Sequence, residues 1–277
     1  MTASSSSPRP SRIKLPCSSG LREVWQRNCP IIGFVLILAL DTSSSVGSLA
    51  VLRDRTILGA VSTATGEIYS SRMFRQLEFL LGELSLSPSD FDLFAVVAGP
   101  GSFTGLRVGL AAVKGLAEVY GKPIVPVSAL EAVAAQSRSL APLLIPVLDA
   151  RRGQIYFGFY RRSAASQDVC LALEGQECVM TSDEFVEILR THHAGCEAVI
   201  VTPELALISG AVSRLETARE PSTRIPVDQV SAILAPHVGQ LGYLRAQRGE
   251  VVDALALDAN YVRRSDAELH LKGSTAS

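Results

Sequence analysis

The sequence lacks the cysteine and histidine patterns that mark metal sites and disulfide frameworks. Its five cysteines are widely spaced, and none forms a C-x-x-C pair. None of the four histidines belongs to an H-E-x-x-H motif or to a pair four residues apart on a helix. These absences argue against a zinc site, a disulfide scaffold and a zinc peptidase, and they favour a reducing compartment.

Long apolar runs and excess charge are also missing. The most apolar run, residues 31–40, has about half of the roughly 20 residues that a membrane span needs. It ends at Asp41 instead of a small-residue cleavage site, and we expect it to be a core strand. The formal net charge is −1, so no overall electrostatic footprint argues for direct nucleic-acid binding. With no signal-peptide cleavage site, we expect a cytoplasmic protein, and we expect residues 1–30 to be a disordered extension or the result of a start codon placed too early.

The chain is organised around residues 98–120, which read AGPGSFTGLRVGLAAVKGLAEVY. An apolar run at residues 93–97 comes before it, and apolar residues spaced by three and four follow its glycines. This pattern predicts a strand, a tight turn and a helix, with Ser102 or Thr104 capping the helix. Such a turn presents backbone donors and the positive end of a helix, a combination that suits an anion.

The order of elements predicts the fold class. Strands are expected at 31–40, 46–52 and 56–62, followed by a helix at 67–84 and, after the glycine turn, a strand at 124–127 and a helix to about 137. We expect a second unit of strands at 143–148, 154–160, 169–173 and 198–202, with helices at 182–190 and 230–248 and a doubtful element at 209–219. This β-β-β-α-β-α-β-α order is typical of the actin-like, ribonuclease-H-like α/β fold with two tandem mixed-sheet subdomains and flanking helices. We place the subdomains at 31–140 and 141–277, with helix 230–248 packing back on the first.

Three enzyme classes with this fold are disfavoured by particular residues. A nuclease would need further acidic residues beside Asp41 to hold its metal ions. Near the end of the fourth strand, where another acidic residue is expected, the sequence has Ala98, Gly99 and Pro100. A kinase or ATPase would grip phosphates between two small-residue hairpins. Asp41–Ser48 can supply the first, but the second, at 149–154, reads DARRGQ, with arginines in place of glycines. The third class, a peptidase, lacks its histidine motif. An actin-like small-molecule kinase or ATPase remains the alternative hypothesis.

Three segments together resemble the TsaB family, also called YeaZ: AGPGSFTGLRVGLAAVKGLAEVY, LALDTSSSVGSLAVL at 38–52 and LDARRGQIYFGFY at 148–160. The resemblance covers residues 31–160 well, and NYVRRSDAELHLK at 260–272 resembles the family's C-terminal ending. It implies a noncatalytic pseudoenzyme that activates TsaD, which transfers a threonylcarbamoyl group to the tRNA adenosine beside the anticodon (the t6A modification). It also implies a TsaD heterodimer joined by the small ATPase TsaE, a homodimer as an alternative state of the isolated chain, and tRNA contact only through the complex.

The resemblance also implies where the partners meet. TsaB proteins use the two helices of the first subdomain, which here are residues 67–84 and 104–120. The predicted interface consists of Met73, Phe74, Leu77, Leu81, Gly105, Gly109 and Ala112. Because an interior glycine costs a helix about 1 kcal/mol, the glycines need a close neighbour, which can be the partner or the chain's own sheet.

A degenerate phosphate loop is the second predicted site. Its residues are Asp41, Thr42, Ser43, Gly99, Gly101, Ser102 and Thr104. We expect no resident cofactor or metal there, and ATP or ADP binding only weakly or within the complex.

Overall fold

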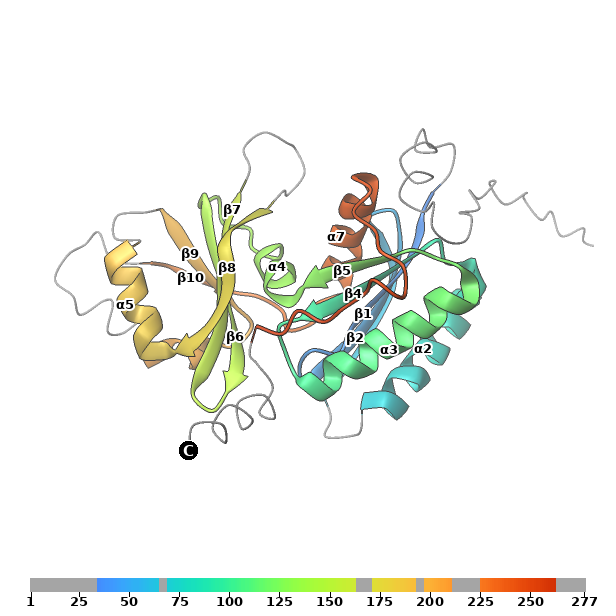
Figure 1. Cartoon of the computed structure of the whole chain (residues 1–277), viewed down its shortest axis with the longest axis horizontal. Coiled ribbons are helices and arrows are strands. Elements are labelled where there is room, and N and C mark those ends of the chain that lie inside the picture. Colours follow the sequence, from blue (N-terminus) through green and yellow to red (C-terminus); the bar gives the residue numbers. More distant parts are fainter. Residues whose placement is uncertain (1–33, 65–68, 163–170, 193–196, 211–224, 263–277) are drawn as a thin grey trace, which may run out of the picture.

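The computed structural model describes residues 34–64, 69–162, 171–192, 197–210 and 225–262. Within them the chain forms two five-stranded sheets with helices against their faces (Figure 1). The strands are β1 (Leu36–Asp41), β2 (Val46–Arg53), β3 (Thr56–Ala64), β4 (Leu93–Gly99), β5 (Ile124–Ser128), β6 (Leu143–Arg151), β7 (Gln154–Arg162), β8 (Leu171–Thr181), β9 (Ala198–Thr202) and β10 (Val227–Gln229). The α-helices are α2 (Tyr69–Leu84), α3 (Phe103–Tyr120), α4 (Ala129–Ala134), α5 (Ser182–His192) and α7 (Ala235–Gln247), with 3₁₀ turns at Pro88–Asp90 and Leu205–Leu207.

The two sheets have the same topology. The first has the order β3-β2-β1-β4-β5, and the second has the order β10-β9-β6-β7-β8, which is the same arrangement read from the other edge. In each, the first three strands form an antiparallel meander, and the fourth and fifth run parallel to the first. The chain therefore repeats one structural plan twice, and the predicted actin-like, ribonuclease-H-like fold class is confirmed.

Side chains alternate across β1 and so build two cores, one on each face of the first sheet. Leu36, Leu38 and Leu40 pack with α2 and α3, and Ile37 and Ala39 pack on the opposite face with α4 and α7. The core on the α4 and α7 side continues into buried residues of β6, β7 and β9, so one apolar cluster joins both sheets. A third cluster lies between the second sheet and α5.

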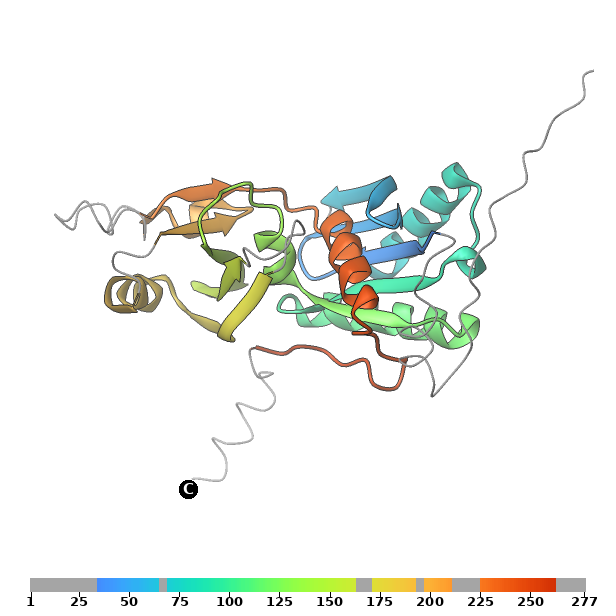
Figure 2. The ribbon, with the colours of Figure 1, turned by 90° about the horizontal axis from the view of Figure 1, so that it is seen from above.

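Helix α7 returns to the first sheet. It contacts β1, β2, β4 and β5, and Figure 2 shows it lying across that sheet. None of the helices in the described parts of the chain is long and apolar enough to cross a membrane. The subdomain boundary near residue 140 stays a prediction, and that residue lies in the connection between α4 and β6.

Several element boundaries differ from those predicted. Strand β8 continues to Thr181 instead of ending at 173. The prediction stopped too early because β8 is a polar edge strand with Gly175 at φ 75°, so its sequence shows no apolar alternation. Strand β10 was missed because it has only three residues. The last helix begins at Ala235 instead of 230, with a proline in its first turn, where a missing N–H does no harm. Helix α4 ends at Ala134. Most of 209–219 and all of 1–30 lie outside the described residues.

Candidate functional site

The turn after β1 and the turn before α3 pack directly against each other. The Thr42 hydroxyl donates to the Gly105 carbonyl oxygen at 2.7 Å, and the Ser102 amide donates to the Ser43 carbonyl oxygen at 2.7 Å. A Cβ at Gly101 would lie 2.5 Å from that Ser43 oxygen, so only glycine fits. The structure thus brings two parts of the predicted phosphate loop together, but backbone contacts fill the space between them.

The other residues of this loop lie at the start of α3. Ser102 caps the helix, since its hydroxyl accepts from the Gly105 amide at 3.3 Å, and Thr104 is exposed. Gly99 has a φ of 136°, and a Cβ there would lie 2.3 Å from the Asn260 carbonyl oxygen. The Asn260 amide in turn donates to the Ala98 carbonyl oxygen at 2.8 Å. The stretch of residues 258–262, called the C-terminal segment below, therefore covers this turn through Asn260.

Asp41 is fully buried at the end of β1. Its Oδ1 accepts from the Ser43 amide at 2.8 Å and from the Ser43 hydroxyl at 2.6 Å, whereas its Oδ2 has no hydrogen-bond partner in the described parts of the chain. Burial raises the pKa of Asp41 to about 6, although the two bonds from Ser43 oppose the shift. A carboxylate that orients metal-bound water must reach that water, and this one has no exposed surface.

The β6–β7 hairpin is the second predicted phosphate grip. Arg151, Arg152 and Gly153 have φ values of 64°, 56° and 72°, so two arginines take the left-handed conformation that glycine adopts most easily. Asp149 accepts from the Arg151 amide at 2.7 Å, and its other oxygen lies 3.2 Å from the Arg151 guanidinium. The carboxylate is thus engaged within its own hairpin, and Arg151 projects into solvent.

No three histidine, cysteine, aspartate or glutamate side chains gather as a metal site requires in the described ranges. His237, on α7, is partly buried, and burial lowers its pKa. His193 and His270 lie outside the described residues, as does the side chain of His192.

Several residues of the predicted partner interface lie in the core instead. Met73, Leu77 and Leu81 are buried against the first sheet. Gly105 and Gly109 face inward as well, against Thr42 at the end of β1. A Cβ on Gly105 would lie 2.0 Å from the Thr42 carbonyl oxygen, and a Cβ on Gly109 would lie 2.3 Å from the Thr42 hydroxyl oxygen. The assignment of these five positions to a surface is therefore corrected.

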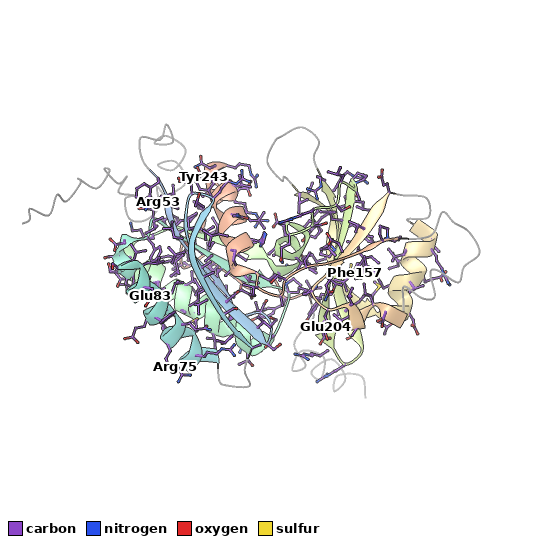
Figure 3. The ribbon with its side chains drawn as sticks, turned by 180° about the vertical axis from the view of Figure 1, so that it is seen from behind. Arg53, Arg75, Glu83, Phe157, Glu204 and Tyr243 are labelled. Atoms are coloured by element: carbon purple, nitrogen blue, oxygen red, sulfur yellow. The ribbon has the colours of Figure 1, made fainter. Side chains whose placement is uncertain are left out.

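The outward face of the same helices does carry apolar groups. Phe74 of the predicted set is 53% exposed and Ala112 is half-buried, and Phe79, which the sequence analysis missed, is 60% exposed. Gly115 is exposed, with open space where a Cβ would stand. Figure 3 shows Arg75 and Glu83 on the outer side of α2, away from the sheet. Phe79 lies five residues after Phe74, a spacing that does not fit the three-and-four period of the buried stripe. This spacing could have indicated that Phe79 is exposed.

A cavity of about 730 Å³ lies between the two sheets and was not predicted. Its walls come from the ends of β4 and β5, from α4, β7, β8 and α7, and from the C-terminal segment. Because these residues are distant in sequence, no local motif could have indicated it.

The chain contains two copies of one mixed-sheet plan, and each copy opens with a hairpin and carries helices on its faces. This arrangement defines the actin-like class of ribonuclease-H-like folds. The family model described as TsaD, tRNA N6-adenosine threonylcarbamoyltransferase, matches residues 56–181. A tRNA threonylcarbamoyladenosine biosynthesis protein TsaB from Bacillus subtilis is 39% identical over 125 residues, which are 45% of this chain and 55% of that protein. The TsaB protein of Escherichia coli is 32% identical over 128 residues, 46% of this chain and 55% of that protein.

Solved structures agree with these matches. YeaZ from Pseudomonas aeruginosa is 25% identical, with a TM-score of 0.65 over 82% of this chain and 99% of that chain. A second crystal structure, of a protein with similarity to peptidase YeaZ from Pseudomonas aeruginosa, gives a TM-score of 0.66 at 25% identity over 83% and 100%. The sequence matches span a little over half the length of the curated relatives. These sequence and structure matches support the resemblance of the chain to the TsaB family, also called YeaZ.

Proposed function

We propose that the chain is a noncatalytic partner that activates a TsaD-type transferase in the threonylcarbamoyl modification of tRNA adenosine. The names of its TsaB relatives support the pathway, and the match to the TsaD family model supports descent from the same fold as the enzyme. The assembly would be a heterodimer, joined by a TsaE-type ATPase in the cytoplasm, and tRNA would be held only through the complex.

The observation that carries the noncatalytic assignment is the state of the two hairpins. In the first, Asp41 is sealed from solvent and the loop is packed on the α3 turn. In the second, Arg151 and Arg152 stand where close backbone approach to a phosphate favours glycine. A kinase or ATPase needs both hairpins to grip one nucleotide, so this arrangement supports a scaffold over the alternative enzyme. Arginine side chains can still bind a phosphate weakly from outside.

The outer face of α2 and α3 is the surface that we propose for the transferase. Exposed aromatic rings on a helix cost solvation free energy until a partner covers them, and buried aromatics dominate most interfaces. Phe74 and Phe79 supply the rings on α2, and Gly115 on α3 leaves room for a close helix contact. The same face would pair two copies of the isolated chain, so homodimer and heterodimer would exclude each other.

Binding of the purified transferase to single variants tests this surface. Phe74→Arg and Gly115→Arg should each weaken binding by about 30-fold or more, because a lost hot spot is worth about 2 kcal/mol. Leu140→Arg is the matched control, since Leu140 is also an exposed apolar residue but lies on the α4–β6 connection. Substitution of Gly109 would be uninformative, because that glycine packs against Thr42. Unchanged binding by both helix variants would refute the surface.

A further inference from the structure

The cavity between the sheets has the size of a small-molecule site. At about 730 Å³ it falls within the range of roughly 300–1,000 Å³ that ligand pockets occupy. Figure 1 shows the elements around it: β5 and α4 on one side, β8 on the other, and the C-terminal segment in front. None of its polar groups belongs to the two hairpins or to the proposed partner surface.

Glu177 on β8 is the centre of the cavity wall. Its Oε1 accepts from the Tyr160 hydroxyl at 2.6 Å and from the Ser128 hydroxyl, and its Oε2 accepts from the Asn260 side-chain amide at 2.7 Å. All three donors are neutral. These bonds hold the carboxylate in one orientation but leave its charge without an opposite charge.

The cavity has more negative than positive charge. Glu131 is paired with Arg245, which also donates to the Pro126 carbonyl oxygen at 2.6 Å. Glu177 and Asp258 complete the charged lining, and in the described parts of the chain neither forms an ion pair. Glu177 is half-buried and Asp258 is exposed, and an incoming cation would supply the opposite charge that the neutral hydrogen-bond donors of Glu177 do not.

Neighbouring groups respond to this negative charge. Burial raises the pKa of Tyr160, and the Glu177 carboxylate raises it further. Burial also raises the pKa of Glu131; Arg245 opposes that shift, and Glu177 adds to it. Burial and then Glu177 raise the pKa of the Cys178 thiol in the same way. The charge of Glu177 is therefore felt by two groups that line the cavity, Tyr160 and Glu131, and by the adjacent Cys178.

The remaining lining is partly apolar and aromatic. Leu171, Leu173 and Val262 supply apolar surface, and Tyr261 at the rim stacks on Phe103 with ring centroids 5.2 Å apart. A divalent metal would need a cluster of ligands that the described residues do not form. A phosphate would meet the net negative lining.

We propose that this cavity binds a small organic cation, whose protonated amino group lies against Glu177 and Asp258 and whose carbon skeleton lies on Leu171, Leu173 and Tyr261. The apolar surface and the Tyr261 ring take the skeleton. The site is independent of the proposed role in tRNA modification, and either can fail without the other.

A matched pair of probes tests the charge preference. Calorimetric titration of the full chain at pH 7 would compare 2-phenylethylamine with 2-phenylethanol, which replaces the ammonium by a hydroxyl, and with 3-phenylpropionate. The amine should bind at least about ten-fold more tightly than the alcohol, a difference of about 1.4 kcal/mol, and the carboxylate should not bind. Equal affinity of amine and alcohol, or preference for the carboxylate, would overturn the proposal.

Variants assign the preference to this cavity. Glu177→Gln keeps the shape of the side chain and one acceptor oxygen, removes the charge, and should abolish the preference for the amine. Glu174→Gln is the control, because Glu174 lies on the same strand outside the cavity and pairs with Arg161 at 3.2 Å. Gln176→Lys changes an exposed residue of the lining and should block the amine by placing a cation beside Glu177. Preference retained in both Glu177→Gln and Gln176→Lys would show that the amine binds elsewhere.

Discussion

At the residue scale, Asp41 has a carboxyl group that water does not reach. Its pKa is about 6 in the folded chain, against an ordinary value of 3.8, because burial penalises the charged form more than the bonds from Ser43 favour it. The folded state therefore binds the proton more tightly than the unfolded state. By linkage, the free energy of unfolding falls as pH rises from about 4 to about 6, and the loss is complete above that range.

Replacing Asp41 by asparagine should remove this dependence. The amide oxygen of the new side chain is expected to keep an acceptor for the Ser43 bonds, and the amide cannot ionise. The difference in pKa corresponds to about 3 kcal/mol, so the native chain should lose about that much more stability than Asp41→Asn between pH 4 and pH 7. Urea denaturation of both proteins across that range measures it, and other titrating groups cancel in the difference. Parallel stability curves would show that folding does not raise the pKa of Asp41.

At the element scale, α2 and α3 illustrate what a sequence pattern can and cannot predict. The three-and-four spacing located both helices, because a buried stripe requires that period. It did not show which apolar residues face the chain's own sheet, so Met73, Leu77 and Leu81 were assigned to a partner when they belong to the core. The glycine turn was predictable from its composition, but the Thr42 contact that requires Gly109 comes from the end of β1, more than sixty positions earlier.

Strand β8 and the cavity were less predictable for a related reason. An edge strand with exposed polar residues has no apolar alternation to detect. The bond between Glu177 and Asn260 joins residues 83 positions apart, so it exists only after the two sheets are formed. Local composition could predict the other elements of the candidate site, whereas the part of β8 that carries Glu177 and the pairing of distant side chains had to come from the structure.

The two central glycines of α3 should respond to alanine in opposite directions. Gly115→Ala should stabilise the chain by up to about 1 kcal/mol, because a Cβ there meets open space and alanine favours the helix. Gly109→Ala should destabilise it by about 1–3 kcal/mol, since the new Cβ would displace the Thr42 hydroxyl from its bond to Gly105. Thermal unfolding measures both changes. A gain in stability from Gly109→Ala would contradict the close packing of α3 on β1.

At the scale of the whole molecule, one fold plan is used twice, and the hairpin that opens each copy has a feature that disfavours a close phosphate grip. The first hairpin is closed by the α3 turn, and the second carries two left-handed arginines. The apolar core that joins the sheets is retained, as is the helix pair with its exposed phenylalanines. This combination of a preserved frame, altered hairpins and an uncovered apolar face is what we expect of a subunit that works through another protein.

Reconstitution of tRNA modification tests this account most directly. Purified TsaD-type and TsaE-type proteins, tRNA, ATP and a threonylcarbamoyl donor would be incubated with and without the chain, and modified adenosine would be measured by mass spectrometry. We expect the chain to raise the yield by at least about ten-fold, equivalent to about 1.4 kcal/mol of barrier, and to hydrolyse no ATP when alone. An unchanged yield, together with ATP turnover by the isolated chain, would contradict the account and favour the kinase or ATPase alternative.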